Sequence, residues 1–203
     1  MRVGPLFTPP SAQGTIMRPG VLGGADWAVG AFDPSTGVLY VKVNANPSLL
    51  RPRIPDQDGN IRPGGGPGAL LTIGDNIPVL KPPYAFLDAV DLNAGKMLWQ
   101  VPFGDDEDLR KNPALQGVKL PAKLGAVGDA GVMVTKGGIV FVGGGDAAFH
   151  AVDKQNGEDL WSYPTGGIKT NGPPMTYSIG GRQYVVIAIG GAGADASLLA
   201  FGL

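Results

Sequence analysis

The sequence contains no cysteine and a single histidine, His150. The absence of cysteine excludes disulfides, thiolate zinc sites and cysteine nucleophiles. Neither sign of charge is in excess, because 16 Lys and Arg residues face 17 Asp and Glu residues. Nucleic acid is therefore not an expected partner, since such binding relies on a basic surface that releases counterions from phosphates. No run of 18 apolar residues occurs, so no transmembrane helix is predicted.

Glycine and proline, in contrast, are abundant. The chain has 34 Gly and 19 Pro, about a quarter of its 203 residues, which taken alone would indicate a disordered chain. Hydrophobic residues make up 43% and charged residues only 16%, so there is enough apolar material for a core. We therefore expect many short elements separated by turns, and not a helical bundle.

An internal repeat is the clearest pattern in the chain. Residues 89–99 and residues 151–161 share an Ala, an Asp two places later, a Gly six places later and a Trp ten places later. A weaker copy at 31–40 keeps the Ala, Asp and Gly but ends in Tyr40. The copies start about 60 residues apart, which predicts three units of one supersecondary kind.

Each residue of the repeat has a physical interpretation. The Asp side chain is expected to accept hydrogen bonds from the following turn, and the Gly to adopt the positive φ that closes a hairpin with a bulge. The Trp is expected to be largely buried between neighbouring sheets, with a partner for its indole N–H. The residues in these roles are Asp91, Gly95 and Trp99 in one copy and Asp153, Gly157 and Trp161 in the other.

Apolar runs between the copies predict strands at 131–134, 138–142 and 183–189. Many short strands, turn signals between them and an aromatic motif in each repeat favour an all-β fold, a β-propeller. Residues 1–203 are interpreted as one domain. The segments 47–83 and 105–123 interrupt the rhythm and are interpreted as long loops within that domain.

The tryptophan repeat resembles the docking motif of quinoproteins, the dehydrogenases that use pyrroloquinoline quinone (PQQ). Other segments resemble the C-terminal part of the glucose-dehydrogenase-like branch in order and spacing, over nearly all 203 residues. They are 5–15, 23–27, 32–41, 135–141, 174–177 and 181–186.

The resemblance implies an eight-bladed propeller with PQQ and Ca²⁺ on its axis, which oxidises a sugar or alcohol hydroxyl by hydride transfer to PQQ and passes electrons to a quinone-type acceptor. At roughly 60 residues per blade, this chain supplies three to four blades. The catalytic Asp, the calcium ligands and the missing N-terminal blades are then expected outside it, and the isolated chain is expected to be inactive. The resemblance also implies a periplasmic location, with membrane association through a missing N-terminal segment.

Three residues are carried over from the resemblance as cofactor-binding candidates, and no catalytic or metal-binding residue is assigned. Trp27 matches a Trp near the cofactor, Asp26 takes the place of a neighbouring Asn or Glu, and Asn44 matches an Asn near the quinone. Each has a simpler alternative: core packing for Trp27, a turn residue for Asp26, and a turn cap before Pro47 for Asn44.

Other features are open to a different interpretation. A non-catalytic propeller that serves as a scaffold for protein binding fits the charge and the repeat equally well.

The Gly-rich run 143–148 and a second at 191–196 fit a dinucleotide-binding pattern, but neither is followed by a predicted helix, so both are rejected. His150, on a predicted strand, is interpreted as a surface or satisfied core residue and not as a ligand.

Overall fold

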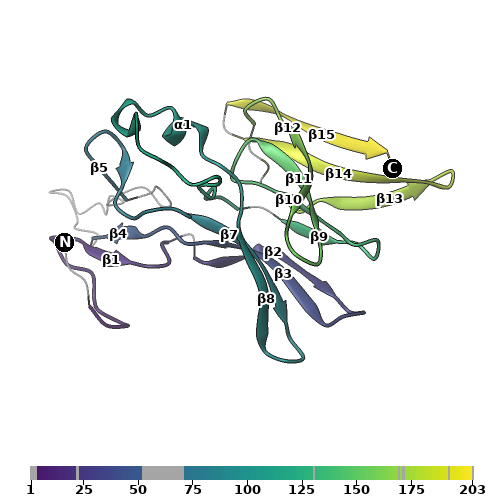
Figure 1. Cartoon of the computed structure of the whole chain (residues 1–203), viewed down its shortest axis with the longest axis horizontal. Coiled ribbons are helices and arrows are strands. Elements are labelled where there is room, and N and C mark those ends of the chain that lie inside the picture. Colours follow the sequence, from purple (N-terminus) through teal and green to yellow (C-terminus); the bar gives the residue numbers. More distant parts are fainter. Residues whose placement is uncertain are drawn as a thin grey trace, which may run out of the picture.

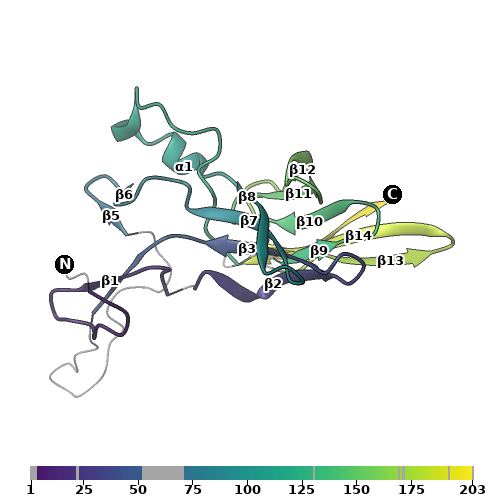
Figure 2. The ribbon, with the colours of Figure 1, turned by 60° about the horizontal axis from the view of Figure 1, so that its bottom comes forward.

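The computed structural model describes residues 4–21, 23–51, 71–129, 131–168, 170, 172–191 and 193–202, and for residues 26–29 and 194 it describes the backbone alone. This part of the chain is built almost wholly from antiparallel strands (Figure 1). Three larger sheets lie side by side, with their first strands toward one side of the molecule (Figure 2). This is the arrangement of neighbouring β-propeller blades, so the predicted fold is confirmed.

The first sheet contains four strands in the order β2-β3-β7-β8. Its strands are β2 (Ala25–Asp33), β3 (Val38–Asn44), β7 (Ala85–Asp91) and β8 (Lys96–Pro102). The β-branched and aromatic side chains of β3 favour an extended chain, and both of its faces are covered.

The second sheet repeats this pattern, and the third is shorter. The second has the order β12-β11-β10-β9, formed by β9 (Val132–Val134), β10 (Ile139–Gly143), β11 (Ala148–Asp153) and β12 (Asp159–Pro164). The third has three described strands, β13 (Met175–Ile179), β14 (Arg182–Gly191) and β15 (Ala194–Gly202). The strands predicted at 131–134, 138–142 and 183–189 are therefore confirmed.

The turn chemistry of the two strong repeat copies is also confirmed. Asp91 and Asp153 each accept a hydrogen bond from the backbone N–H two residues on, at 2.8 and 2.6 Å. Gly95 and Gly157 have φ values of +62° and +75°. A register shift follows in each hairpin, β7–β8 and β11–β12, as expected for a bulge.

The interpretation of the weaker copy is wrong in one respect. Residues 31–40 span the turn between β2 and β3, the first two strands of the sheet that also contains the copy at 89–99. It is therefore not a third unit. The similarity reflects shared turn chemistry, because Asp33 accepts a hydrogen bond from the Ser35 N–H at 2.9 Å and Gly37 has a φ of +74°.

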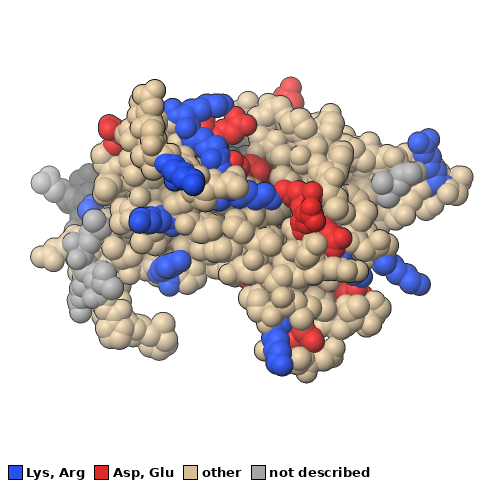
Figure 3. Space-filling model, in the orientation of Figure 1, with Lys and Arg blue, Asp and Glu red and all other residues tan. Residues whose placement is uncertain are grey.

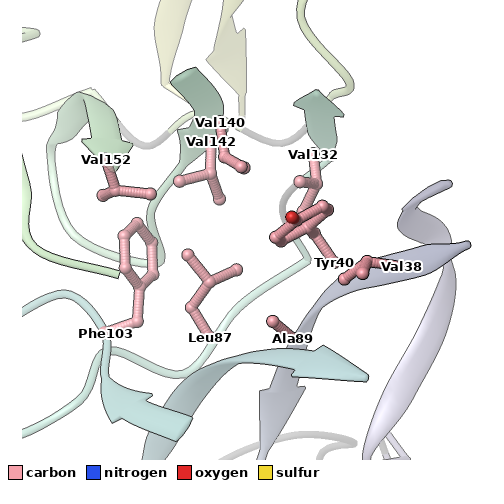
Figure 4. Packing of buried hydrophobic residues seen from close by; sticks show 9 residues of the cluster. All are labelled: Val38, Tyr40, Leu87, Ala89, Phe103, Val132, Val140, Val142 and Val152. Carbon is pink, nitrogen blue, oxygen red and sulfur yellow. The ribbon is translucent and has the colours of Figure 1, made fainter. Parts of the chain in front are cut away.

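The larger core lies between the first and second sheets (Figure 4). Strands β3 and β7 face β9, β10 and β11 there. The Phe103 ring, which follows β8, packs against the same residues. The nine buried residues are Val38, Tyr40, Leu87, Ala89, Phe103, Val132, Val140, Val142 and Val152. Burial of the larger side chains contributes roughly 1.5–3 kcal/mol each. A smaller cluster joins the second and third sheets through Phe141, Phe149, Ala151, Val185 and Ile187.

The two repeat tryptophans differ in burial. Trp99 is half-buried, and its Nε1 donates a hydrogen bond to the Lys154 carbonyl of the second sheet at 3.2 Å. Its ring lies against Gly157, where a Cβ atom would stand only 2.8 Å away. Trp161 is 41% exposed, so the prediction that it is largely buried is wrong. The turn that covers Trp99 joins the third and fourth strands of the next sheet, and the described third sheet has no fourth strand.

The segments between the strands contain little regular structure. In 47–83, β4 (Ser48–Leu50) pairs with β1 (Thr15–Met17) and β5 (Thr72–Ile73) with β6 (Ile77–Pro78), while 52–70 lie outside the described residues. The other predicted loop contains α1 (Glu107–Arg110) and the 3-10 turn η1 (Pro113–Leu115).

No helix among the described residues is long and apolar enough to cross a membrane. Charges of both signs are mixed on the face shown in Figure 3.

Candidate functional site

The face of β3 that meets the second sheet changes character along the strand. Val38 and Tyr40 are buried in the apolar core, whereas Lys42 and Asn44, the next two residues of the same face, are polar and only 1% and 4% exposed. Buried polar groups are costly unless they are hydrogen-bonded, so such a pair at the end of a strand indicates a specific role.

Lys42 and Asn44 form a small network with the backbone of Gly128. The Lys42 Nζ donates to the Gly128 carbonyl at 2.6 Å and to the Asn44 Oδ1 at 3.2 Å. The Gly128 N–H donates to the same Asn44 Oδ1 at 3.2 Å. Lys42 makes a further interaction besides these.

This network fixes the orientation of the Asn44 amide. An ammonium group and a backbone N–H can only donate, so both must face the amide oxygen. The Asn44 Nδ2, which carries two N–H donors, is therefore directed away from them, and among the described residues no group accepts a hydrogen bond from it. The Asn44 amide thus keeps an unused donor among the described residues.

A second amide follows two residues later. Asn46 is fully buried, and neither its Oδ1 nor its Nδ2 has a hydrogen-bond partner among the residues that the structure describes. Its backbone is firmly held, because the Asn46 carbonyl accepts from the Gly20 N–H and the Ala45 N–H donates to the Tyr84 carbonyl, both at 2.8 Å. A buried amide whose two polar atoms are unpaired among the described residues is a second unusual polar group beyond the end of β3.

The other two sequence candidates lie on the neighbouring strand. Asp26 and Trp27 belong to β2, which pairs with β3 through Ala25 and Val43 before the register shifts. The structure therefore brings the backbone of all three candidates to one end of the first sheet. The side chains of Asp26 and Trp27 lie outside the described residues, so their assignment stays a prediction.

Comparisons with known proteins identify the family of the chain. A family model described as "PQQ: Glucose/ethanol/alcohol dehydrogenase, beta-propeller domain" matches residues 1–185. The chain belongs to this family. The sequence-based recognition of a quinoprotein dehydrogenase is thereby confirmed.

Individual members of this dehydrogenase family show the same relationship. The chain is 34% identical over 215 residues to the glycerol dehydrogenase large subunit of Gluconobacter thailandicus, covering 91% of this chain and 28% of the relative. It is 32% identical over 216 residues to the quinoprotein glucose dehydrogenase of Escherichia coli (strain K12), covering 95% and 26%. The chain thus spans about a quarter of the length of the curated relatives that it matches.

Solved structures of dehydrogenases have a similar fold. The quinohemoprotein alcohol dehydrogenase from Comamonas testosteroni is 26% identical with a TM-score of 0.56, over 86% of this chain and 24% of the other. A europium-containing methanol dehydrogenase, 23% identical, gives a TM-score of 0.51 over 84% of this chain and 25% of the other.

The sequence analysis of this family member missed Lys42, Gly128 and Asn46. A lysine inside an apolar strand was a usable signal, because Lys42 interrupts a run of valines. Gly128 had none, since its role depends on a contact between segments 84 residues apart. No group of three or more His, Asp or Glu side chains among the described residues could hold a metal ion, so the calcium ligands expected outside the chain stay a prediction.

Proposed function

We propose that this chain forms part of the PQQ site of a dehydrogenase that oxidises a sugar or alcohol hydroxyl, with a quinone-type compound as the final electron acceptor. Family membership supports an oxidoreductase that depends on PQQ. The observation in the chain itself that carries the proposal is the Asn44 amide, whose oxygen is occupied and whose nitrogen remains free to donate.

The residues at the end of β3 fit this cofactor. PQQ presents carbonyl and carboxylate oxygens, which are acceptors only, and the Asn44 Nδ2 is a donor only. The buried ammonium of Lys42 adds positive charge beside an anionic ligand while it orients the amide. PQQ supplies the two-electron acceptor for oxidation of the hydroxyl.

The remaining parts of the site belong to the proposal as expectations. Trp27 and Asp26 would lie beside the cofactor on β2, whereas the catalytic base, a Ca²⁺ ion with its ligands and the other blades would come from N-terminal sequence outside this chain. The location would be periplasmic, with attachment to a membrane through a missing N-terminal segment. A purely scaffolding propeller would not need a buried polar network at this end of β3.

Titration of PQQ against the 203-residue chain, followed by quenching of tryptophan fluorescence and by equilibrium dialysis, tests the proposal. We expect weak, saturable binding that does not survive gel filtration, because only part of the site is present. Asn44→Ala should weaken binding about tenfold, the effect of one hydrogen bond to a charged group. Asn156→Ala, in an exposed turn at the opposite end of the sheets, should not change it.

Equal affinity in the Asn44→Ala and Asn156→Ala variants would overturn the assignment of Asn44. Tight binding through gel filtration, or reduction of a dye with glucose by this chain alone, would contradict the expectation that the remaining groups lie elsewhere.

A further inference from the structure

Two sequence features are not used by the proposed site: the run Gly143-Gly144-Gly145-Asp146 and the single histidine. The structure brings the glycine run against Gly128 of the proposed site, and His150 contacts this run through Asp146. The run forms the end of β10 and the turn into β11, and His150 follows on β11. His150 is buried, at 7% exposure, with the edge of the Phe103 ring against it.

The turn rests directly on the residue that orients Asn44. A Cβ atom on Gly128 would stand 2.9 Å from the Cα of Gly145, and one on Gly145 would stand 2.2 Å from the carbonyl oxygen of Val127. Glycine is therefore required on both sides of this backbone contact. Any movement of the turn reaches the N–H and carbonyl of Gly128, which hold Asn44 and Lys42.

The two ring nitrogens of His150 face two carboxylates, and one of them, Asp146, belongs to the turn between β10 and β11. Its Nε2 lies 3.3 Å from both carboxylate oxygens of Asp146, and its Nδ1 lies 3.6 Å from the Asp159 Oδ1. Asp146 also accepts from the Asp105 N–H at 3.1 Å, and Asp159 is paired with Lys123.

The segment that ends at Gly128 is thus tied to the second sheet at both of its ends. Asp105 lies near its start and Lys123 near its end. Within the segment, Asp105 is itself paired with Arg110, whose guanidinium donates to the Pro121 and Ala122 carbonyls at 2.9 and 2.8 Å. His150 lies between these two connections, Asp105–Asp146 and Lys123–Asp159, and contacts the carboxylates of Asp146 and Asp159.

We propose that His150, as an imidazolium ion, is a positioning residue for the cofactor site: it holds the turn at Gly144–Asp146 against Gly128 and so fixes the donor orientation of Asn44. This inference rests on the proposed function of Asn44. It gives the lone histidine and the glycine run one common role.

The charge state of His150 agrees with this role. Burial lowers the pKa of His150, but the hydrogen bond to Asp146 and the negative charges of Asp146 and of nearby Asp159 outweigh it and raise this pKa to about 9. The imidazolium is therefore present at neutral pH and is lost in alkaline solution. A groove of about 690 Å³, lined by Asp105–Asp108, Gly145–Ala148 and five other residues, opens beside Asp146 and gives solvent protons a path to the network.

The decisive experiment measures hydrogen exchange of peptides that cover Gly128, in the cofactor-free chain between pH 7 and 10, with the intrinsic pH effect on exchange removed. We expect protection of this segment to fall about tenfold over this range in the unchanged chain. In His150→Gln, which keeps an amide donor but cannot be charged, protection should already be lower at pH 7 and should stay constant. Peptides from the third sheet serve as the internal control.

Titration with PQQ at the same pH values is the second readout. The affinity of the unchanged chain should fall about tenfold between pH 7 and 10, and that of His150→Gln should not. The residual pH dependence of Asn44→Ala reports the contribution of all other groups, including those of PQQ itself. Asp146→Asn, of the same size, should reproduce the His150→Gln pattern if the latter variant does not fold.

The two readouts separate the two proposals. A change of Gly128 protection with pH but no Asn44-dependent binding of PQQ would overturn the proposed function and retain the role of His150 in holding the turn against Gly128. Binding that depends on Asn44 with Gly128 protection independent of pH and of His150 would overturn the positioning role and retain the function.

Discussion

The two boundaries between the sheets are built from the same repeat but differ in what crosses them. At the first boundary, the Trp99 indole bonds to the Lys154 carbonyl at 3.2 Å, and the Lys154 ammonium bonds to Asp33 at 2.8 Å. At the second boundary, Trp161 is 41% exposed and packs mainly on Phe201, with ring centroids 5.3 Å apart.

The difference teaches that a docking tryptophan is buried by the following repeat and not by its own. Trp99 lies against Gly157 because the second sheet has a turn between its third and fourth strands at that place. The described third sheet offers no such turn to Trp161. The first boundary also contains the Lys42–Asn44–Gly128 network and the contacts of His150 with Asp146 and Asp159. The boundary with the better-buried tryptophan is therefore the one that carries the proposed site.

The largest expected effect separates the two tryptophans directly. Trp99→Ala should lower the free energy of unfolding by about 4 kcal/mol, because it removes a docked ring and leaves a cavity. Trp161→Ala should cost only about 1–2 kcal/mol, since its ring is partly solvated and loses mainly aromatic contacts. Urea denaturation of both variants measures the difference. Equal losses would show that the second boundary is as firmly docked as the first.

The next effect is a pH dependence that belongs to the first boundary. Because the folded chain raises the pKa of His150 from its usual 6.5 to about 9, the imidazolium stabilises the fold in full below pH 6.5. That contribution, about 3 kcal/mol, should be lost as the pH rises through about 9. The urea midpoint should therefore fall between pH 7 and 10.

His150→Gln is the matched control for this pH series. Its urea midpoint should be lower at pH 7 and nearly level up to pH 10, where the two curves should meet. A slope as steep as that of the unchanged chain would assign the pH dependence to other groups, such as Tyr40, whose pKa is raised mainly by burial.

The smallest effect uses two glycines at the same place in the repeat. Gly95 and Gly157 both have a positive φ, but a Cβ at Gly95 would meet nothing within 4 Å, whereas one at Gly157 would strike the Trp99 ring. Gly95→Ala should cost about 1 kcal/mol from backbone strain alone, and Gly157→Ala about 2 kcal/mol. Thermal denaturation can compare them. A smaller loss for Gly157→Ala would mean that Trp99 does not dock on this turn.

Much of the fold could be predicted from the sequence, because the repeat consists of local signals. The Asp-to-Gly spacing of a turn, the bulge and the following strand are all fixed within about ten residues. The weak copy at 31–40 was misplaced for the same reason: identical turn chemistry closes the hairpin of β2 and β3 and the hairpin of β7 and β8. The exposure of Trp161 could not be predicted, because it depends on how the third sheet packs against the ring and not on local sequence.

The site could be predicted only in part. Asn44 was proposed by resemblance and stays a prediction, but its orientation depends on Gly128, and that contact is not visible in local sequence. A strand and not a helix follows the Gly143–Asp146 run, as predicted, yet the packing of this run against Gly128 requires the three-dimensional fold. Lys42 was the one missed residue with a local signal, a charged side chain inside a strand of valines.

The central claim is that the Asn44 side-chain nitrogen faces the cofactor. Its most direct test is NMR of the side-chain amide groups of the ¹⁵N-labelled chain during titration with PQQ, with the Asn44 signals assigned by their loss in Asn44→Ala. We predict saturable shifts of the two Nδ2 protons of Asn44 and none for Asn156. Binding of PQQ that leaves the Asn44 amide signals unchanged would contradict the account.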